Sequence, residues 1–341
     1  MGVDASLWGG RLGLVFDAYY KYTRGMLMSV AIPNQPNLTR NEGEMSNWGL
    51  EFALNSVNVA KKDKKVAIFS PFYENYGADT ILSGAEPVYI PLVPPDYHFD
   101  PELLEQAFKD GAKVLILCNP SNPSGKVFTR EELSVIAALA ERYDIWVVTD
   151  EVYEHILYKP YEHVYIATLP EMRERTIICS SLSKTYSITG WRLGYACGPG
   201  NIIAQMTKIH QFAIMCAPTT SQYAAVEAVK NGDEDIAKMR ESYNQRRRFL
   251  LNAFKEMGIE CFEPFGAFYV FPCIKEFGMT SDEFATRFLQ EEKVAAVPGT
   301  AFGDSGEGYL RISYAYSLER LKEAMTRFDR FVKKLRAEQE V

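Results

Sequence analysis

From about residue 65 onward, short apolar runs alternate with amphipathic segments, and this order predicts strands and helices in turn. Residues 114–118 and 145–148 are continuous apolar runs, which are typical of strands that a parallel sheet buries on both faces. The same reading predicts strands at 66–70, 86–91, 176–179 and 193–197, and helices at 100–108, 129–143, 202–212 and 221–231. The alternation indicates an α/β fold with a large, mostly parallel sheet.

The C-terminal part of the chain shows the same alternation on a smaller scale. A long charged helix is predicted at 236–257 and a closing amphipathic helix at 318–338, with a further helix at 281–292 and strands at 259–262, 266–271, 294–297 and 309–314. We therefore expect a large domain over residues 63–233 and a small C-terminal α/β domain over residues 234–341.

The first 62 residues follow a different pattern. Apolar and polar residues alternate with period two over 11–22 and again over 48–59, and a segment rich in Pro, Asn and Gly separates them at 33–43. Period-two alternation is typical of strands. The pattern predicts two antiparallel strands in a separate N-terminal segment, residues 1–62.

Composition narrows the class of protein. The 341 residues are 47% hydrophobic and 24% charged, as in soluble globular proteins. A formal net charge of −7 argues against a nucleic-acid partner. The six cysteines form no C-x-x-C pair, so neither a metal site nor a disulfide framework is indicated and a reducing, cytoplasmic location is expected. No signal peptide and no membrane-spanning apolar run are recognised, so no membrane association is expected.

Lys184 is the first candidate for chemistry. It follows the apolar run 176–179 and precedes the apolar segment 193–197, so we expect it on a loop between two buried strands. Burial disfavours the charged form of an amine and makes it nucleophilic. Ser181, Ser183 and Arg192 lie close to it in the sequence and offer the hydroxyl and guanidinium groups that bind phosphate. A nucleophilic lysine among phosphate-binding groups suggests pyridoxal 5′-phosphate (PLP).

Polar residues also follow the other two buried strands. Asn122 lies in the Asn-Pro-rich segment after residue 118, and Asp150 follows residue 148. Carboxyl ends of parallel strands form the edge where ligands bind in open α/β sheets. A carboxylate at the end of an apolar strand is costly to bury unless a cation meets it. The protonated nitrogen of the PLP ring would be that cation for Asp150.

These motifs resemble the class I and II aminotransferases, which are fold-type I PLP enzymes, over a similarity that runs from about residue 65 to the C-terminus. The resemblance implies that Lys184 carries PLP and moves the proton during the reaction. It implies that Tyr73 stacks on the ring and that Asn122 and Tyr153 bind its phenolic oxygen. Arg311, in the segment Tyr-Leu-Arg-Ile-Ser, and Asn122 are implied to bind the substrate.

The family also implies a reaction and an assembly. We expect transamination between an L-amino acid, aspartate or an aromatic one, and 2-oxoglutarate, carried out by a homodimer. The same fold supports PLP-dependent β-lyases, so elimination is the alternative reaction.

The N-terminal segment does not share this resemblance. Residues 16–27 and 41–52 look instead like strands of TonB-dependent outer-membrane receptors, which suggests a fused chain. An ordinary soluble hairpin appended to the enzyme is the alternative. In the family, the N-terminal part supplies backbone N–H groups that hold the PLP phosphate. We find no Gly-rich phosphate segment before Lys65, so we expect weak PLP retention. A third reading of the chain is therefore an inactive, truncated or fused aminotransferase.

Overall fold

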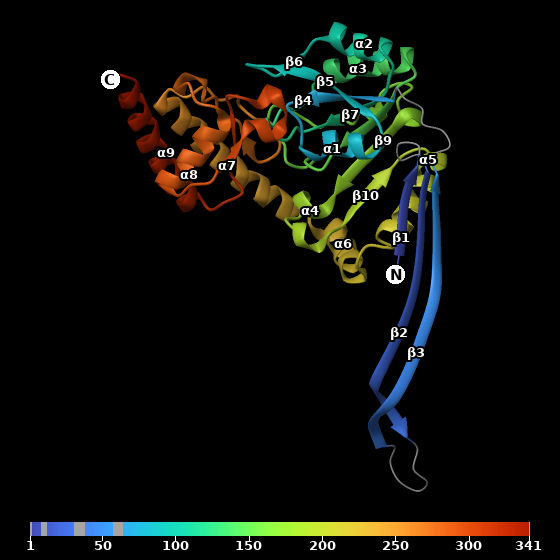
Figure 1. Cartoon of the computed structure of the whole chain (residues 1–341). Coiled ribbons are helices and arrows are strands. Elements are labelled where there is room, and N and C mark those ends of the chain that lie inside the picture. Colours follow the sequence, from blue (N-terminus) through green and yellow to red (C-terminus); the bar gives the residue numbers. More distant parts are fainter. Residues whose placement is uncertain (1, 8–11, 31–37, 57–63, 341) are drawn as a thin grey trace. The chain divides into compact units, whose positions relative to one another are not determined.

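The structure is a computed structural model and describes residues 2–7, 12–30, 38–56 and 64–340. The chain divides into two compact units, residues 1–62 and residues 63–341 (Figure 1). We describe each unit by itself. The boundary expected at residue 233 falls inside the second unit and stays a prediction.

The first unit is an antiparallel sheet of the strands β1 (Gly2–Leu7), β2 (Leu12–Val30) and β3 (Leu38–Ser56), in that spatial order. The predicted antiparallel pairing of two strands is confirmed by β2 and β3. The prediction was wrong in missing β1 and in making both long strands too short. Parts of the predicted strand 48–59 and linker 33–43 lie outside the described residues. None of the side chains described in this unit is buried.

The second unit is built on a seven-stranded sheet, and the expected mostly parallel α/β fold is confirmed. Its strands are β4 (Lys65–Ser70), β5 (Glu86–Val93), β6 (His98–Phe99), β7 (Ala112–Cys118), β8 (Trp146–Asp150), β9 (Thr176–Ser181) and β10 (Gly194–Cys197). The spatial order is β10-β9-β8-β7-β4-β5-β6. The inner pairs are parallel, and β6 and β10 add antiparallel edges.

Helices accompany this sheet at sites that the sequence largely predicts. They are α1 (Asn75–Leu82), α2 (Pro101–Lys109), α3 (Arg130–Arg142), α4 (Leu182–Thr185), α5 (Gly200–Ala213) and α6 (Thr219–Asn231). The side chain of Asp100 caps α2, and Thr129 with Glu132 forms the predicted capping box of α3. Helix α1 was not predicted. A hydrophobic core that includes Leu115, Val147 and Phe128 fills the space between sheet and helices.

The C-terminal part has a second core, beside an antiparallel sheet of order β11-β13-β12. Its elements are α7 (Asp233–Met257), β11 (Tyr269–Val270), α8 (Ser281–Glu292), β12 (Val297–Pro298), β13 (Leu310–Ser313) and α9 (Leu318–Gln339). The helices predicted at 236–257, 281–292 and 318–338 agree closely with α7, α8 and α9. The predicted strand at 259–262 is wrong, because only an isolated bridge at Cys261 forms there. The strand at 294–297 is shifted, because only Val297 and Pro298 pair with β13.

Short 3-10 helices complete this unit at Ile166–Thr168, Arg173–Arg175, Thr189–Trp191, Lys275–Phe277, Gly299–Phe302 and Asp304–Gly306. Within the described ranges, no helix is both long and apolar enough to cross a membrane.

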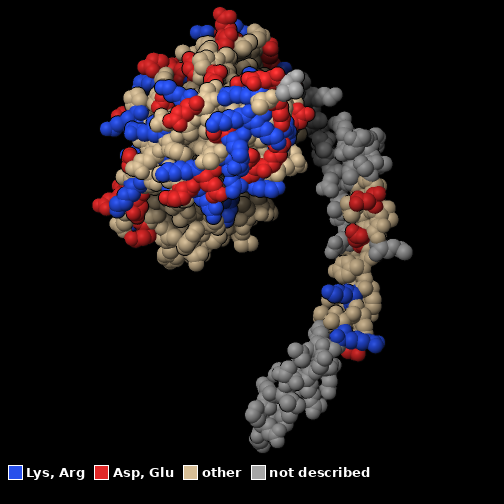
Figure 2. Space-filling view, turned by 90° about the vertical axis from the view of Figure 1, so that its left-hand side faces the viewer, with Lys and Arg blue, Asp and Glu red and all other residues tan. Residues whose placement is uncertain are grey.

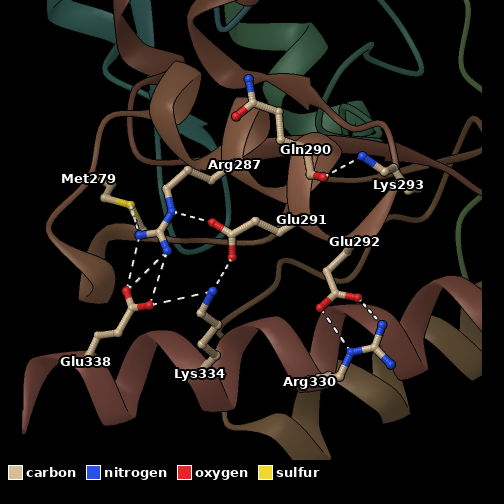
Figure 3. Close-up of polar contacts among 9 residues, drawn as sticks. All are labelled: Met279, Arg287, Gln290, Glu291, Glu292, Lys293, Arg330, Lys334 and Glu338. Atoms are coloured by element: carbon tan, nitrogen blue, oxygen red, sulfur yellow. Dashed lines mark hydrogen bonds and ion pairs between the residues drawn. The ribbon is translucent and has the colours of Figure 1, made fainter.

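Ion pairs connect α8 with α9 on the surface of the C-terminal part. Arg287 contacts both Glu291 and Glu338, and Lys334 lies 2.6 Å from Glu291 (Figure 3). Figure 2 shows Lys and Arg interspersed with Asp and Glu over the face it presents. Since exposed ion pairs each contribute only about 0.2–1 kcal/mol, the buried aromatic residues between the helices, such as Phe284, Phe288 and Phe328, hold them together.

Candidate active site

The carboxyl ends of β7, β8 and β9 bring polar groups to one edge of the large sheet, as predicted. Cys118 pairs with Asp150, and Asp150 pairs with Cys179, so three strand ends lie side by side in register. A cavity of about 680 Å³ opens at this edge, within the usual size range of small-molecule sites.

Seven of the nine predicted site residues line this cavity: Tyr73, Asn122, Asp150, Tyr153, Ser181, Lys184 and Arg311. Ser183 and Arg192 are not among the lining residues. The residues come from separate stretches of sequence, and the folding of the sheet brings them to one place.

Asp150 is the last residue of β8, and its carboxylate has two hydrogen-bond donors. The phenol of Tyr76 donates to Oδ2 at 2.6 Å, and the backbone N–H of Val152 donates to Oδ1 at 3.1 Å. Burial raises the pKa of Asp150, while the two donors and the charge of Lys184 oppose that rise. The carboxylate is therefore poised for a cationic partner in the cavity.

Lys184 lies on α4, a single helical turn, and the expectation of a loop is wrong. The side chain of Ser181 caps this turn by accepting a hydrogen bond from the N–H of Ser183, which is why a short helix forms where the sequence pattern indicated irregular structure. Burial lowers the pKa of Lys184, and the charges of Arg192 and Arg311 lower it further. The amine is thus closer to its neutral, nucleophilic form than an exposed lysine is.

Of the three side chains expected to bind phosphate, Ser181, Ser183 and Arg192, only that of Ser181 is among the cavity-lining residues. The Ser181 hydroxyl donates to the carbonyl of Leu193 at 3.0 Å, besides capping α4. Ser183 is buried. Arg192 is exposed, and its Nη1 donates to the carbonyl of Thr189 at 2.9 Å. Their role in phosphate binding stays a prediction.

Arg311 and Asn122 both line the cavity and are in contact with each other. Nη1 of Arg311 donates to Oδ1 of Asn122 at 2.9 Å, and the guanidinium lies over the rings of Tyr269 and Phe302 at 4.7 and 4.5 Å. Such contacts fix the plane of the guanidinium. The hydroxyl of Tyr153 is 3.0 Å from that of Tyr269. A guanidinium held in this way is suited to bind a carboxylate with two parallel hydrogen bonds.

Glu74, Tyr76, Asp79 and Tyr269 are among the lining residues that sequence reasoning did not assign to the site. The first three lie in α1 or directly before it, and that helix was not predicted. The aromatic run around Tyr73 was the available signal, because Tyr76 lies one helical turn further along the same segment. Tyr269 had no local signal beyond its place in an apolar strand.

The donor set fits PLP. The cavity combines an amine of lowered pKa (Lys184), a buried carboxylate that favours a cation (Asp150), and an amide and a phenol (Asn122 and Tyr153). These are the groups that would hold an aldehyde carbon, a protonated ring nitrogen and a ring oxygen. Arg311 adds a second cation to the cavity, and its guanidinium is available to bind a substrate carboxylate.

Comparisons with known proteins agree with this geometry. The family model described as "Aminotransferase class I and II" matches residues 49–328. The putative aminotransferase YugH of Bacillus subtilis is 44% identical over 81% of this chain and 72% of its own length. An aspartate aminotransferase of Pyrococcus abyssi is 40% identical over 80% of this chain and 71% of its own length.

A solved structure gives the same result for the fold. An aromatic aminotransferase from Pyrococcus horikoshii superposes with a TM-score of 0.78 at 40% identity, over 81% of this chain and 75% of its own length. The resemblance to fold-type I enzymes is confirmed. The receptor-like origin suggested for the first 60 residues is not borne out by these comparisons.

The raised pKa of Asp150 predicts a stability effect in the protein without cofactor. Because the folded-state pKa is raised, ionising this carboxylate destabilises the fold above its unfolded-state pKa. Asp150→Asn should therefore raise the thermal midpoint at about pH 7, and the gain should shrink as the pH falls to about 4. Thermal unfolding across that range checks this.

Asp144→Asn is the control for the loss of an exposed carboxylate, since the Asp144 side chain is 89% exposed and its ion pair with Arg175 is at the surface. A destabilised Asp150→Asn variant at neutral pH would show that the hydrogen bonds outweigh the burial of the charge.

Proposed function

This chain belongs to the family of class I and II aminotransferases, and we propose that its cavity exchanges the amino group of an aromatic or aspartate-like L-amino acid with 2-oxoglutarate. Enzymes of this family transfer amino groups and use PLP. The observation that carries the proposal is the grouping of Lys184, Asp150 and Arg311 around one cavity.

We assign the proton transfer to Lys184. When bound, PLP supplies an electron sink for the negative charge that develops at the substrate Cα. The lowered pKa of Lys184 suits it to take the proton from that carbon and to return it to the cofactor side. Asp150 would hold a proton at the ring nitrogen of bound PLP, because that positive charge would stabilise its buried carboxylate.

Arg311 is assigned to the substrate α-carboxylate. Its guanidinium faces the cavity and already donates to Asn122, so both side chains are held before the substrate arrives. A carboxylate bound bidentately has a fixed direction, which orients the bond to the Cα proton towards Lys184.

The charges around the cavity favour an aromatic donor over aspartate. Among the lining residues that the structure describes, Lys184 and Arg311 are the cations and both have assigned partners. The substrate side chain then meets the rings of Tyr73 and Tyr269 and the carboxylates of Glu74 and Asp79. A second substrate carboxylate is repelled there, whereas an aromatic ring gains contact area.

The assembly and the location of the enzyme are also proposals. Helices α5 and α6 and the segment between them expose large apolar side chains, among them Phe212 (93%), Met215 (76%) and Tyr223 (76%). Contiguous exposed apolar surface often marks an interface, so we propose a homodimer that covers this face. The six free cysteines support a reducing, cytoplasmic location.

Weak PLP retention stays a prediction. The Ser181 hydroxyl is already bonded to backbone groups, and Arg192 is exposed. Charge-assisted hydrogen bonds contribute about 1.5–3 kcal/mol each, so each one missing at the phosphate weakens binding by an order of magnitude or more.

Covalent capture tests the assignment of Lys184. Borohydride reduction of the PLP-loaded protein should fix the cofactor on the peptide that contains Lys184, and Lys184→Ala should abolish that adduct, because no other lining amine is described. Lys238→Ala, on the exposed face of α7, is the matched control. A stable adduct in Lys184→Ala would overturn the assignment, and keto-acid formation without any added 2-oxo acid would favour the β-lyase.

Arg311→Lys tests the carboxylate site. Lysine cannot form the two parallel hydrogen bonds, so KM should rise about tenfold or more for the amino acid and the 2-oxo acid together. Steady-state kinetics with each substrate varied in turn measures this. Arg320→Lys, an exposed change on α9, should leave both values unchanged. An effect on one substrate alone would assign Arg311 to side-chain recognition instead.

Glu74→Gln tests the proposed donor preference. Removing this charge should raise kcat/KM for aspartate relative to phenylalanine by about two- to fivefold, since solvent screens the charge of an exposed side chain. Competition between the two donors measures the ratio, and Glu141→Gln, on the exposed face of α3, is the control. An unchanged ratio would remove Glu74 from donor recognition.

A further inference from the structure

A group of buried polar side chains lies next to the cavity without lining it. Glu151 follows Asp150 directly and is completely buried (0% exposed), yet it is not among the cavity-lining residues. The hydroxyl of Thr149 donates to its Oε1 at 2.6 Å. Consecutive residues at a strand end point in opposite directions, so Asp150 faces the cavity while Glu151 faces the protein interior.

The imidazole of His163 faces the carboxylate of Glu151. Its Nε2 lies 2.9 Å from Oε2 of Glu151, and its side chain is only 9% exposed. The two atoms approach closely without the geometry of a hydrogen bond, and neither imidazole nitrogen has a hydrogen-bond partner in the part of the chain that the structure describes. The contact is therefore electrostatic, and the ring packs edge-on against Tyr165 at 4.4 Å.

A second buried carboxylate continues the group towards α4. Glu154 accepts hydrogen bonds from Tyr165, from Ser180 at 2.8 Å and from Tyr195 at 3.0 Å. Ser180 directly precedes Ser181, the cap of α4. The group thus connects the end of β8, which carries Asp150, with the segment that carries Lys184.

The charges of this group need compensation. Burial raises the pKa of Glu151, and the imidazole of His163 opposes that rise, whereas the charge of Glu154 adds to it. The other titratable groups that Glu151 acts on are Cys118, Tyr165 and Cys179, whose pKa values its charge raises. None of them is a cation, and the imidazole Nε2 of His155 lies 3.9 Å from Oε1 of Glu154. Without His163, Glu151 would be a buried carboxylate without a facing imidazole, directly beside Asp150 in the sequence.

We propose that His163 is a positioning residue of this enzyme: it compensates the buried carboxylate of Glu151, so that the end of β8 keeps Asp150 in its place at the cavity. This inference rests on the proposed function of Asp150 as the partner of the ring nitrogen.

Three variants separate charge compensation from packing. His163→Gln leaves a buried carboxylate without its partner, whereas Glu151→Gln and the double variant Glu151→Gln/His163→Gln leave a neutral pair of similar size. We expect His163→Gln to weaken PLP binding about tenfold, the factor that corresponds to one pKa unit. Both other variants should stay within about twofold of the unmodified protein. Glu162→Gln, an exposed neighbour of His163, is the control.

PLP dissociation constants, measured by absorbance titration without any substrate, give the readout. The deficit of His163→Gln should grow from about pH 6 to about pH 8.5, because Glu151 loses its proton as the pH rises. The double variant should show no such growth. If His163→Gln does not fold, recovery of a folded, PLP-binding protein in the double variant supports the same conclusion.

Two results would overturn the inference. One is a double variant that binds PLP no better than His163→Gln, which would give His163 a packing role. The other is equal damage from Glu151→Gln alone. Failure of Asp150 itself is distinguishable, because Asp150→Asn would then bind PLP normally whatever the state of the pair.

Discussion

The constraint on which this structure depends is a carboxylate buried at the end of a parallel strand. Asp150 lies between Cys118 and Cys179 in register, and burial raises the pKa of both thiols, that of Cys179 to about 11. The thiols therefore remain neutral and bring no compensating charge. Tyr76 and the N–H of Val152 provide hydrogen bonds, but a buried charge is fully stabilised only by an opposite charge. Asp150 is thus costly for folding and useful for binding a cation.

The sequence predicted the large sheet well because its signals are local and unambiguous. A continuous apolar run such as that of β7 is compatible with few environments, and burial on both faces of a parallel sheet is one of them. The capping box of α3 likewise lies within four residues, Thr129 to Glu132. The small sheet was predicted less well. β11 and β12 are two residues each, and their pairing with β13 depends on distant residues that no local pattern specifies.

The site was predictable where chemistry and strand ends coincide. Asp150 and Lys184 follow apolar runs, and their charges stand out against that background. Tyr76 was missed because it reaches Asp150 across 74 positions of sequence, from a helix without a predicted cap. Arg311 meets Asn122 across 189 positions, so only the family resemblance could identify it. Contacts between residues so far apart in the sequence arise from tertiary packing, which the hydrophobic periodicity of the sequence does not specify.

The N-terminal unit shows what a period-two pattern leaves open. β2 and β3 do pair along their length, so the alternation identified strands correctly. Yet Tyr19 and Tyr20, neighbours on opposite faces of β2, are 47% and 70% exposed, and Trp48 of β3 is 75% exposed. Alternation of apolar and polar residues normally indicates a sheet with one buried face. Among the side chains described in this unit, neither face of the sheet is buried. A sheet of three strands without a core gains little hydrophobic stabilisation of its own. The aminotransferase unit differs in this respect, because two hydrophobic cores stabilise it.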